Sequence, residues 1–133
     1  MPRGACLLVV DADAERRARI AAVLGREIEV VACADLDAAR DALEAHEVDV
    51  VFLDAVVGAS DGVALCAELR RSRPLVPVVL VASSKDQEIA VRALRAGAWD
   101  FLSRPFPDPL LREVVRRAVD NRRLRAEVRE LRR

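Results

Sequence analysis

The chain has 133 residues, which is the length of a single globular domain. Hydrophobic residues make up 53% of it and charged residues 33%, so the sequence supplies a buried core and is not typical of a disordered chain. Its 22 basic residues balance its 22 acidic residues, which argues against a generally basic nucleic-acid-binding protein.

The charge is unevenly distributed along the chain. Residues 1–107 carry 13 Lys/Arg against 17 Asp/Glu, whereas residues 108–133 carry nine Arg against five acidic residues. No apolar run approaches the ~20 residues of a membrane-spanning helix, and Asp11 and Asp13 interrupt the first apolar stretch, so we expect no signal peptide. These features favour a cytoplasmic protein without a membrane partner.

Cysteine and histidine usage excludes several kinds of site. The three cysteines are widely spaced and form no metal-ligand or CxxC pattern, so we expect reduced, buried thiols. The single histidine, His46, cannot supply a histidine-based metal site or a Ser-His-Asp triad. The first strand is followed by Asp-Ala-Asp-Ala-Glu in place of a glycine-rich phosphate loop, which excludes a typical nucleotide or flavin site. We therefore expect that the chain is not an enzyme.

Five short runs rich in β-branched residues predict five strands, at residues 6–10, 28–32, 48–53, 76–81 and 99–102. Helical patterns lie between them at residues 14–25, 36–46, 61–71 and 86–96, the last with a capping box of Ser84 and Gln87. A fifth, extended helix begins near Asp108. Strict alternation of strand and helix predicts an α/β doubly wound parallel sheet with helices on both faces.

Charged side chains follow several of the predicted strands. Asp11 and Asp13 come after the first, Asp54 after the third and Arg104 after the fifth. Functional sites of such folds lie at the carboxyl ends of the strands, so we expect these side chains to converge. Crowded carboxylates need a cation, and oxygen ligands are those that Mg²⁺ prefers. The pattern predicts a Mg²⁺ site with Arg104 nearby.

Several stretches resemble the receiver domain of bacterial response regulators over about residues 4–120. They are Leu8-Val9-Val10-Asp11-Ala12-Asp13, residues 49–54, Ser60-Asp61-Gly62, residues 77–81 and residues 97–106. The resemblance implies a flavodoxin-like five-stranded parallel sheet in the order 2-1-3-4-5 with five helices. It also implies a histidine kinase or another signalling protein as partner.

The resemblance also implies the roles of individual residues. Asp54 would be the phosphoacceptor, and Asp11, Asp54 and the backbone carbonyl of Val56 would hold Mg²⁺, with Asp13 as a further candidate ligand. The Arg104-Pro105 peptide would be cis, a conformation common only before proline.

Five positions depart from the family's pattern: Ala12, Gly58 where a proline is usual, Ala82, Phe101 and Arg104. Three of them bear directly on the binding of metal and phosphoryl group. Ala12 replaces an acid that is usually the direct metal ligand, which costs affinity for Mg²⁺. Ala82 replaces Thr or Ser, which removes a hydrogen bond to the phosphoryl group worth about 1.5–3 kcal/mol. Ser83 is adjacent, but strand alternation predicts that it points to the other side. Arg104 replaces Lys, and its larger, forked group could bridge the two carboxylates in the metal position.

Two interpretations of the site stay open. In the first, the chain is an atypical, phosphorylation-poor receiver with weakened Mg²⁺ binding, which works in phosphorelay signalling and transcription control through protein–protein contacts. In the second, it is a conventional receiver phosphorylated on Asp54 with Mg²⁺.

The last helix continues past the predicted receiver, and we interpret residues 121–133 as a helical extension or coiled-coil linker. A heptad register predicts a parallel homodimer through this helix, with the misfit Arg117. A solvated helix with a narrow apolar stripe is the alternative. Residues 120–131 resemble the linker between receiver and ATPase domain in alternative-sigma-factor activators. The register places Val114, Asn121 and Val128 at position a, and Leu110, Leu124 and Leu131 at position d.

Two aromatic residues are further candidates for a partner interface. Trp99 is expected either to be exposed as an interface anchor or to pack against the fourth helix. Phe101 stands at the aromatic switch position of the family and cannot donate a hydrogen bond as a tyrosine would. Nucleic acid is an unlikely partner, because the arginines of the last helix alternate with acids and no aromatic platform accompanies them.

Overall fold

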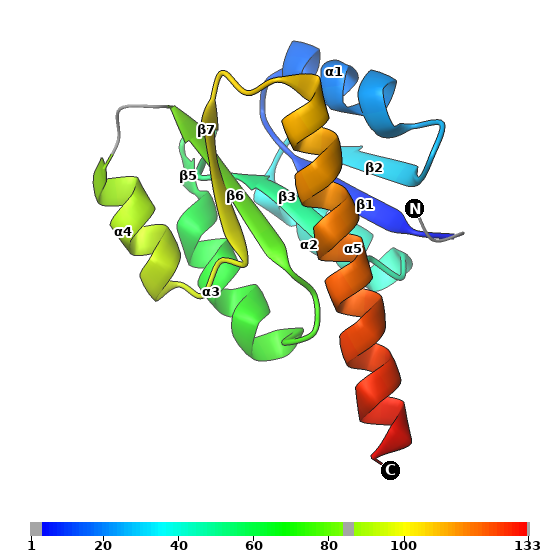
Figure 1. The fold of residues 1–133 in the computed structure, drawn as a ribbon. Coiled ribbons are helices and arrows are strands. Elements are labelled where there is room, and N and C mark those ends of the chain that lie inside the picture. Colours follow the sequence, from blue (N-terminus) through cyan, green and yellow to red (C-terminus); the bar gives the residue numbers. More distant parts are fainter. Residues whose placement is uncertain (1–3, 84–86, 133) are drawn as a thin grey trace.

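The structure is a computed structural model that describes residues 4–83 and 87–132. Five parallel strands form its main sheet in the order β2-β1-β3-β6-β7 (Figure 1), which confirms the predicted order. Their bounds are β1 Cys6–Val10, β2 Glu29–Cys33, β3 Val50–Asp54, β6 Val78–Ser83 and β7 Asp100–Arg104. Each lies within about two residues of its predicted position, as expected for boundaries inferred from periodicity.

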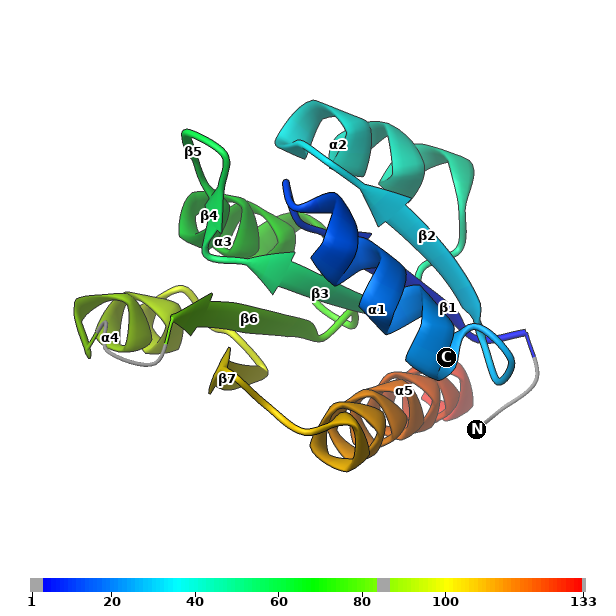
Figure 2. The same ribbon diagram turned by 90° about the horizontal axis from the view of Figure 1, so that it is seen from above.

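Helices cover both faces of the sheet. One face is covered by α1 (Ala14–Leu24) and α5 (Asp108–Leu131), which lie side by side (Figure 2). The opposite face is covered by α2 (Leu36–Ala45), α3 (Gly62–Ser72) and α4 (Gln87–Arg95). The chain therefore has the flavodoxin-like, doubly wound architecture that the alternation of strands and helices predicts.

The central strands are buried on both faces. Leu7 and Val9 of β1 pack under α1 and α5, whereas Leu8 and Val10 pack under the other three helices. All four are fully buried, and each contributes about 1.5–3 kcal/mol relative to an exposed position. This two-sided burial explains why β1, β3 and β6 are almost continuously apolar.

Aspartates begin three of the helices. The carboxylates of Asp13, Asp35 and Asp61 accept backbone N–H groups at the starts of α1, α2 and α3. Side-chain caps of this type satisfy donors that the first helical turn leaves free. The predicted capping box at α4 falls on Ser84, which lies outside the described residues together with Lys85 and Asp86.

A short hairpin after β3 was not predicted from the sequence. It consists of β4 (Val56–Val57) and β5 (Ser60–Asp61), joined through Gly58, whose φ of +62° favours glycine. Two-residue strands are too short to produce a detectable alternation of apolar and polar residues. The hairpin leads the chain away from the carboxyl end of β3 and into α3.

Helix α5 extends beyond the edge of the sheet (Figure 1). Its apolar side from Leu111 to Val119 is buried against the sheet and α1. The prediction that Val114 belongs to a partner interface is wrong, because this side chain is 4% exposed and lies in the core. The exposed apolar residues of the later turns are Leu124, Val128 and Leu131, while Asn121 is half-buried.

An ion pair ties this extension to the body. Arg123 donates from Nε to Oδ1 of Asp49 (2.8 Å) and from Nη2 to Oδ2 (3.1 Å). Asp49 is buried and also accepts the N–H of Cys6 at 2.9 Å. The helix is thus held against the amino-terminal edge of the sheet one turn beyond its last fully buried residue. Among residues 4–83 and 87–132, no helix is long and apolar enough to cross a membrane.

Candidate functional site

The sheet brings together the residues that follow its central strands. Asp11 lies after β1, Asp54 ends β3, Ala82 lies near the end of β6 and Arg104 ends β7. Both carboxylates are buried, with exposed fractions of 4% for Asp11 and 5% for Asp54. The structure therefore confirms the predicted convergence at the carboxyl edge of the sheet.

Arg104 contacts both carboxylates. Its Nη2 atom lies 2.9 Å from Oδ2 of Asp54 and 3.4 Å from Oδ2 of Asp11. The Arg104–Pro105 peptide is cis, as the resemblance implied. The interpretation that Arg104 bridges the two carboxylates directly thus agrees with the geometry.

Arg16 of α1 also contacts both carboxylates, and sequence reasoning missed it. Its Nε and Nη2 donate to the two oxygens of Asp11 at 2.8 and 3.0 Å, and Nη2 lies 3.2 Å from Oδ2 of Asp54. The hydrogen bond to Asp11 raises the pKa of the Arg16 guanidinium. A cation in the first turn opposes the helix dipole. The presence of Arg16 in the first turn of α1, where a cation is unfavourable, is the sequence signal that could have indicated a specific anionic partner.

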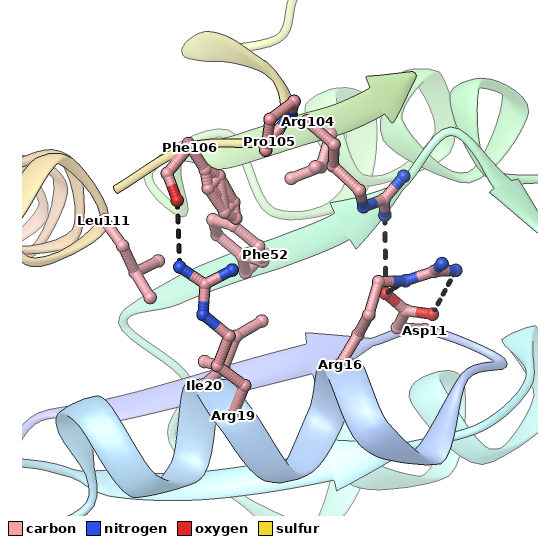
Figure 3. Close-up of a pocket in the computed structure, with 10 residues that line it drawn as sticks. Asp11, Arg16, Arg19, Ile20, Phe52, Arg104, Pro105, Phe106 and Leu111 are labelled. Atoms are coloured by element: carbon pink, nitrogen blue, oxygen red, sulfur yellow. Dashed lines mark hydrogen bonds and ion pairs between the residues drawn. The ribbon is translucent and has the colours of Figure 1, made fainter. Parts of the chain in front are cut away.

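Backbone N–H groups also donate to the two carboxylates. Oδ1 of Asp54 accepts the backbone N–H of Val56 at 3.2 Å, and Oδ1 of Asp11 accepts that of Asp13 at 2.8 Å. Two carboxylates and two guanidiniums cancel in charge. Buried ion pairs persist when the geometry is good and further hydrogen bonds satisfy the remaining lone pairs. We call Asp11, Asp54, Arg16 and Arg104 the ion-pair cluster (Figure 3 shows all of it but Asp54).

Asp13, the further candidate metal ligand, caps α1. Its Oδ1 accepts the backbone N–H groups of Glu15 (2.9 Å) and Arg16 (3.1 Å), and its Oδ2 lies 3.5 Å from Nη1 of Arg16. The backbone hydrogen bond from Arg16 is the main cause that lowers the pKa of Asp13. Its side chain is thus engaged with the helix start.

A cavity of about 260 Å³ lies beside Asp54. Ser83 borders it together with Ala82. That strand alternation turns the side chain of Ser83 away from the site stays a prediction. Ser83 is the last residue of β6. The lining residues are Arg16, Asp54, Val56, Ala82, Ser83, Ile89 and Arg104.

Gly62 permits the close approach of α3 to β3. A Cβ atom at this position would overlap with the backbone oxygen of Asp54, so only glycine fits. Its N–H donates to the carbonyl of Ala55 at 2.9 Å. The Ser60-Asp61-Gly62 motif therefore positions the loop that carries Asp54.

The two aromatic candidates lie on opposite faces. Trp99 is half-buried and packs against the core under α1 and α5, whereas packing on α4 is one of the two alternatives expected from the sequence. Its part as an interface anchor stays a prediction. It borders a cavity together with Arg125 of α5. Phe101 is half-buried and packs under α2, α3 and α4. Its part in a partner interface stays a prediction.

Comparisons with known proteins agree with this geometry. Residues 7–116 match the response regulator receiver domain family. The chain is 34% identical over 128 residues to the nitrogen assimilation regulatory protein NtrX of Azorhizobium caulinodans, covering 94% of this chain and 28% of NtrX. It is 36% identical over 129 residues to the C4-dicarboxylate transport transcriptional regulatory protein DctD of Pseudomonas aeruginosa, covering 95% of this chain and 28% of DctD.

A solved structure also resembles this chain closely. The crystal structure of the receiver domain of NtrX from Brucella abortus superposes with a TM-score of 0.81 at 35% identity, covering 86% of this chain and 98% of that domain. The matches to the longer regulators include α5, which fits the resemblance of the tail to a receiver-to-ATPase linker. The chain spans little more than a quarter of those regulators. It belongs to the response regulator receiver domain family.

Proposed function

We propose that this chain is an atypical receiver that accepts little or no phosphoryl group on Asp54 and signals mainly through protein–protein contacts. Its family acts in two-component signalling, with histidine kinases as partners. The relatives NtrX and DctD are named as regulatory proteins, and we extend transcription control to this chain on that basis. The contact of both arginines with both buried carboxylates carries the proposal.

Phosphorylation requires an oxygen of Asp54 to attack a phosphorus atom. Oδ2 already has Arg104 at 2.9 Å and Arg16 at 3.2 Å, while Oδ1 accepts the N–H of Val56. Attack by Oδ2 therefore requires at least one guanidinium to withdraw from a buried carboxylate. Withdrawal is costly because it leaves a desolvated charge without its partner.

The donor set also fits Mg²⁺ poorly. Receivers of this family normally bind Mg²⁺ at an acidic site. Here the ion would find two carboxylates whose charges are already neutralised, and Ala12 in place of a third. Among the residues that the structure describes, no group of three His, Cys, Asp or Glu side chains is placed to hold a metal ion. Because Mg²⁺ demands near-ideal octahedral oxygen geometry, we propose weakened binding.

A conventional receiver phosphorylated on Asp54 is the second candidate. The cavity of about 260 Å³ beside Asp54 supports it, because this cavity has room for a phosphoryl group. Arg16 and Arg104 border the cavity and would supply positive charge to the phosphoryl oxygens. Ala82 supplies no hydroxyl donor, which weakens this candidate.

We further propose that the chain forms a homodimer through the last turns of α5. Leu124, Val128 and Leu131 are spaced by four and three residues and are 59%, 39% and 81% exposed. Such a stripe fits the same stripe of a second copy in a parallel coil, and Glu127 would face Arg132 across it. This part of the proposal starts at Asn121, because Val114 belongs to the domain core.

Labelling with acetyl phosphate and Mg²⁺, followed by intact mass spectrometry, tests the proposal. The unaltered chain is expected to gain no phosphoryl group. The triple variant Ala12→Asp, Ala82→Thr, Arg104→Lys restores the family's residues and is expected to gain one, which Asp54→Asn removes. Stoichiometric labelling of the unaltered chain, lost in Asp54→Asn, would establish the conventional receiver instead.

A further inference from the structure

A second cavity also borders the ion-pair cluster. Its volume is about 140 Å³, and it lies between α1, the β7–α5 connection and the start of α5 (Figure 3). Asp54 is not among its lining residues, although Arg16 and Arg104 border both this cavity and the one beside Asp54. Its walls are formed by Ile20, Phe52, Val81, Pro105, Phe106 and Leu111, and its rim by Asp11, Arg16, Arg19 and Arg104.

The side chains of the apolar walls pack against one another. Phe52 and Phe106 meet edge to face, with ring centroids 5.9 Å apart and an interplanar angle of 83°. Ile20 and Leu111 are 4% and 0% exposed and belong to the same core. Protein interiors rarely leave voids larger than a water molecule among side chains of this size. An engineered apolar cavity of about 150 Å³ binds benzene, so the volume fits one six-membered ring.

The rim of the cavity is rich in guanidinium groups. Arg19 lies 5.5 Å over the ring of Phe106, and its Nη2 donates to the carbonyl of Phe106 (2.9 Å) and to Oδ1 of Asp108 (2.7 Å). On the other side of Phe52, Arg104 and Arg16 meet at Asp11 (Figure 3). Three arginines border the cavity, and each has an acidic partner: Arg16 and Arg104 pair with Asp11 and Asp54, and Arg19 pairs through Nε and Nη2 with Asp108. The donors that Arg19 can offer to a ligand are therefore those of its Nη1 atom. A planar guanidinium offers five donors in a fixed fork, which suits a carboxylate in the rim.

We propose that this cavity binds a small monocyclic aromatic acid. The ring lies between Phe52, Phe106 and Leu111, and the acid group contacts the arginines of the rim, with Arg19 the most accessible. The inference goes beyond the proposed function and does not depend on it, because neither phosphorylation nor metal binding enters the recognition. Apolar walls with a few directed polar groups are the usual composition of small-molecule sites.

Titration with benzoate, followed by the methyl resonances of the labelled full chain, tests this inference. Saturable shifts are expected at the methyl groups of Ile20, Val81 and Leu111. Methyl benzoate has the same ring without the charge and is expected to bind at least threefold more weakly. Arg19→Gln, a change at a half-exposed side chain, is expected to lower the affinity for benzoate and to leave the affinity for methyl benzoate unchanged.

A matched pair of variants separates this cavity from general hydrophobic binding. Ile20→Phe fills the cavity and is expected to lower the affinity for benzoate at least tenfold. Leu43→Phe inserts the same ring at an equally buried site on the opposite face and is expected to leave binding unchanged. If Ile20→Phe does not fold, the benzoate affinity of Arg19→Gln tests the proposal in its place. Absence of saturable shifts, equal affinity for acid and ester, or unchanged benzoate affinity in folded Ile20→Phe or Arg19→Gln would each overturn the proposal.

Discussion

The Nη2 atom of Arg104 lies 2.9 Å from Oδ2 of Asp54, at the point where a receiver's phosphoacceptor would need a free oxygen. Asp54 is 5% exposed, so the carboxylate has little water and takes its stabilisation from its protein neighbours. Arg16 approaches the same oxygen from α1 at 3.2 Å. The two guanidinium groups therefore neutralise the buried carboxylates, as a metal cation would. Their ion pairs also link α1 and β7 to the central strands.

Removal of the arginines is expected to destabilise the fold cooperatively. Arg104→Ala leaves Asp54 and Asp11 with Arg16, so we expect a loss of about 1–2 kcal/mol in the free energy of unfolding. The double variant Arg16→Ala, Arg104→Ala leaves two buried carboxylates without a cation, and we expect a loss of about 3–5 kcal/mol, more than the sum of the single losses. Urea unfolding of the unaltered chain, the two single variants Arg16→Ala and Arg104→Ala, and the double variant measures this coupling. Strictly additive losses would contradict the description of the cluster as one unit.

The pair between Asp49 and Arg123 is expected to couple the tail helix to the body. Arg123→Ala leaves the buried carboxylate of Asp49 with the N–H of Cys6 alone, and we expect a loss of about 1–2 kcal/mol, reduced by the partial exposure of the arginine. Arg125→Ala, two residues further along α5, is the matched control and is expected to change stability little. If the two changes alter the free energy of unfolding equally, the Asp49–Arg123 ion pair does not stabilise the attachment of α5 to the body.

Charges in the exposed stripe of α5 are expected to abolish the dimer. The double variant Leu124→Glu, Val128→Glu places like charges across the predicted seam, and the dissociation constant should rise at least a hundredfold. Leu110→Glu changes a 42% exposed residue at the other end of α5 and serves as control. Sedimentation equilibrium of the three chains measures the change. A monomeric unaltered chain at high concentration, or a dimer insensitive to the double change, would remove this part of the proposal.

Stability is expected to fall between pH 9 and 11 because Cys6, Cys33 and Cys66 are buried, and burial raises the pKa of all three thiols. Burial raises the pKa of the Cys66 thiol from 9.0 to about 11, and the pKa of Cys6 likewise to about 11. Well below pH 9, both states keep the thiols protonated. As pH rises through this window, the unfolded chain releases protons that the folded chain retains, so Cys6 and Cys66 each cost about 2–3 kcal/mol by pH 11.

Cys66→Ala tests this pH dependence. The variant is expected to lose stability near neutral pH, because a 0% exposed side chain is shortened, but to lose less on raising the pH from 8 to 11. The chain contains no tyrosine, so few other groups titrate in this window. A pH slope equal to that of the unaltered chain, measured by urea unfolding, would show that burial does not hold the thiol neutral.

The strands and the acidic edge were predictable from particular residues. Leu7, Val9, Phe52 and their neighbours form runs without polar interruption, as two-sided burial in a parallel sheet demands. Asp11, Asp54 and Arg104 each end or follow such a run, so the parallel arrangement alone brings them to one edge. The order of strands came from the resemblance to a family and is confirmed by the structure.

What sequence reasoning missed depends on side-chain reach and on packing between helices. Arg16 reaches Asp54 only because α1 begins three residues after Asp11, and no periodicity reports the direction of a long polar side chain. Val114 fits both a coiled-coil heptad and the stripe of α5 that faces the core. Because of the way α5 packs on the sheet, Val114 lies in the core. Trp99 turns toward the α1 and α5 face for the same reason: strand alternation is weak at the start of an edge strand.

Mg²⁺ titration of the unaltered chain and of the double variant Arg16→Gln, Arg104→Lys tests the central claim most directly. The backbone amide resonances of Asp54 and Val56 report occupancy beside the phosphoacceptor. If the two arginines occupy the place of the cation, the unaltered chain binds Mg²⁺ weakly and the variant binds at least tenfold more tightly. Equal, tight binding by both proteins would contradict the claim.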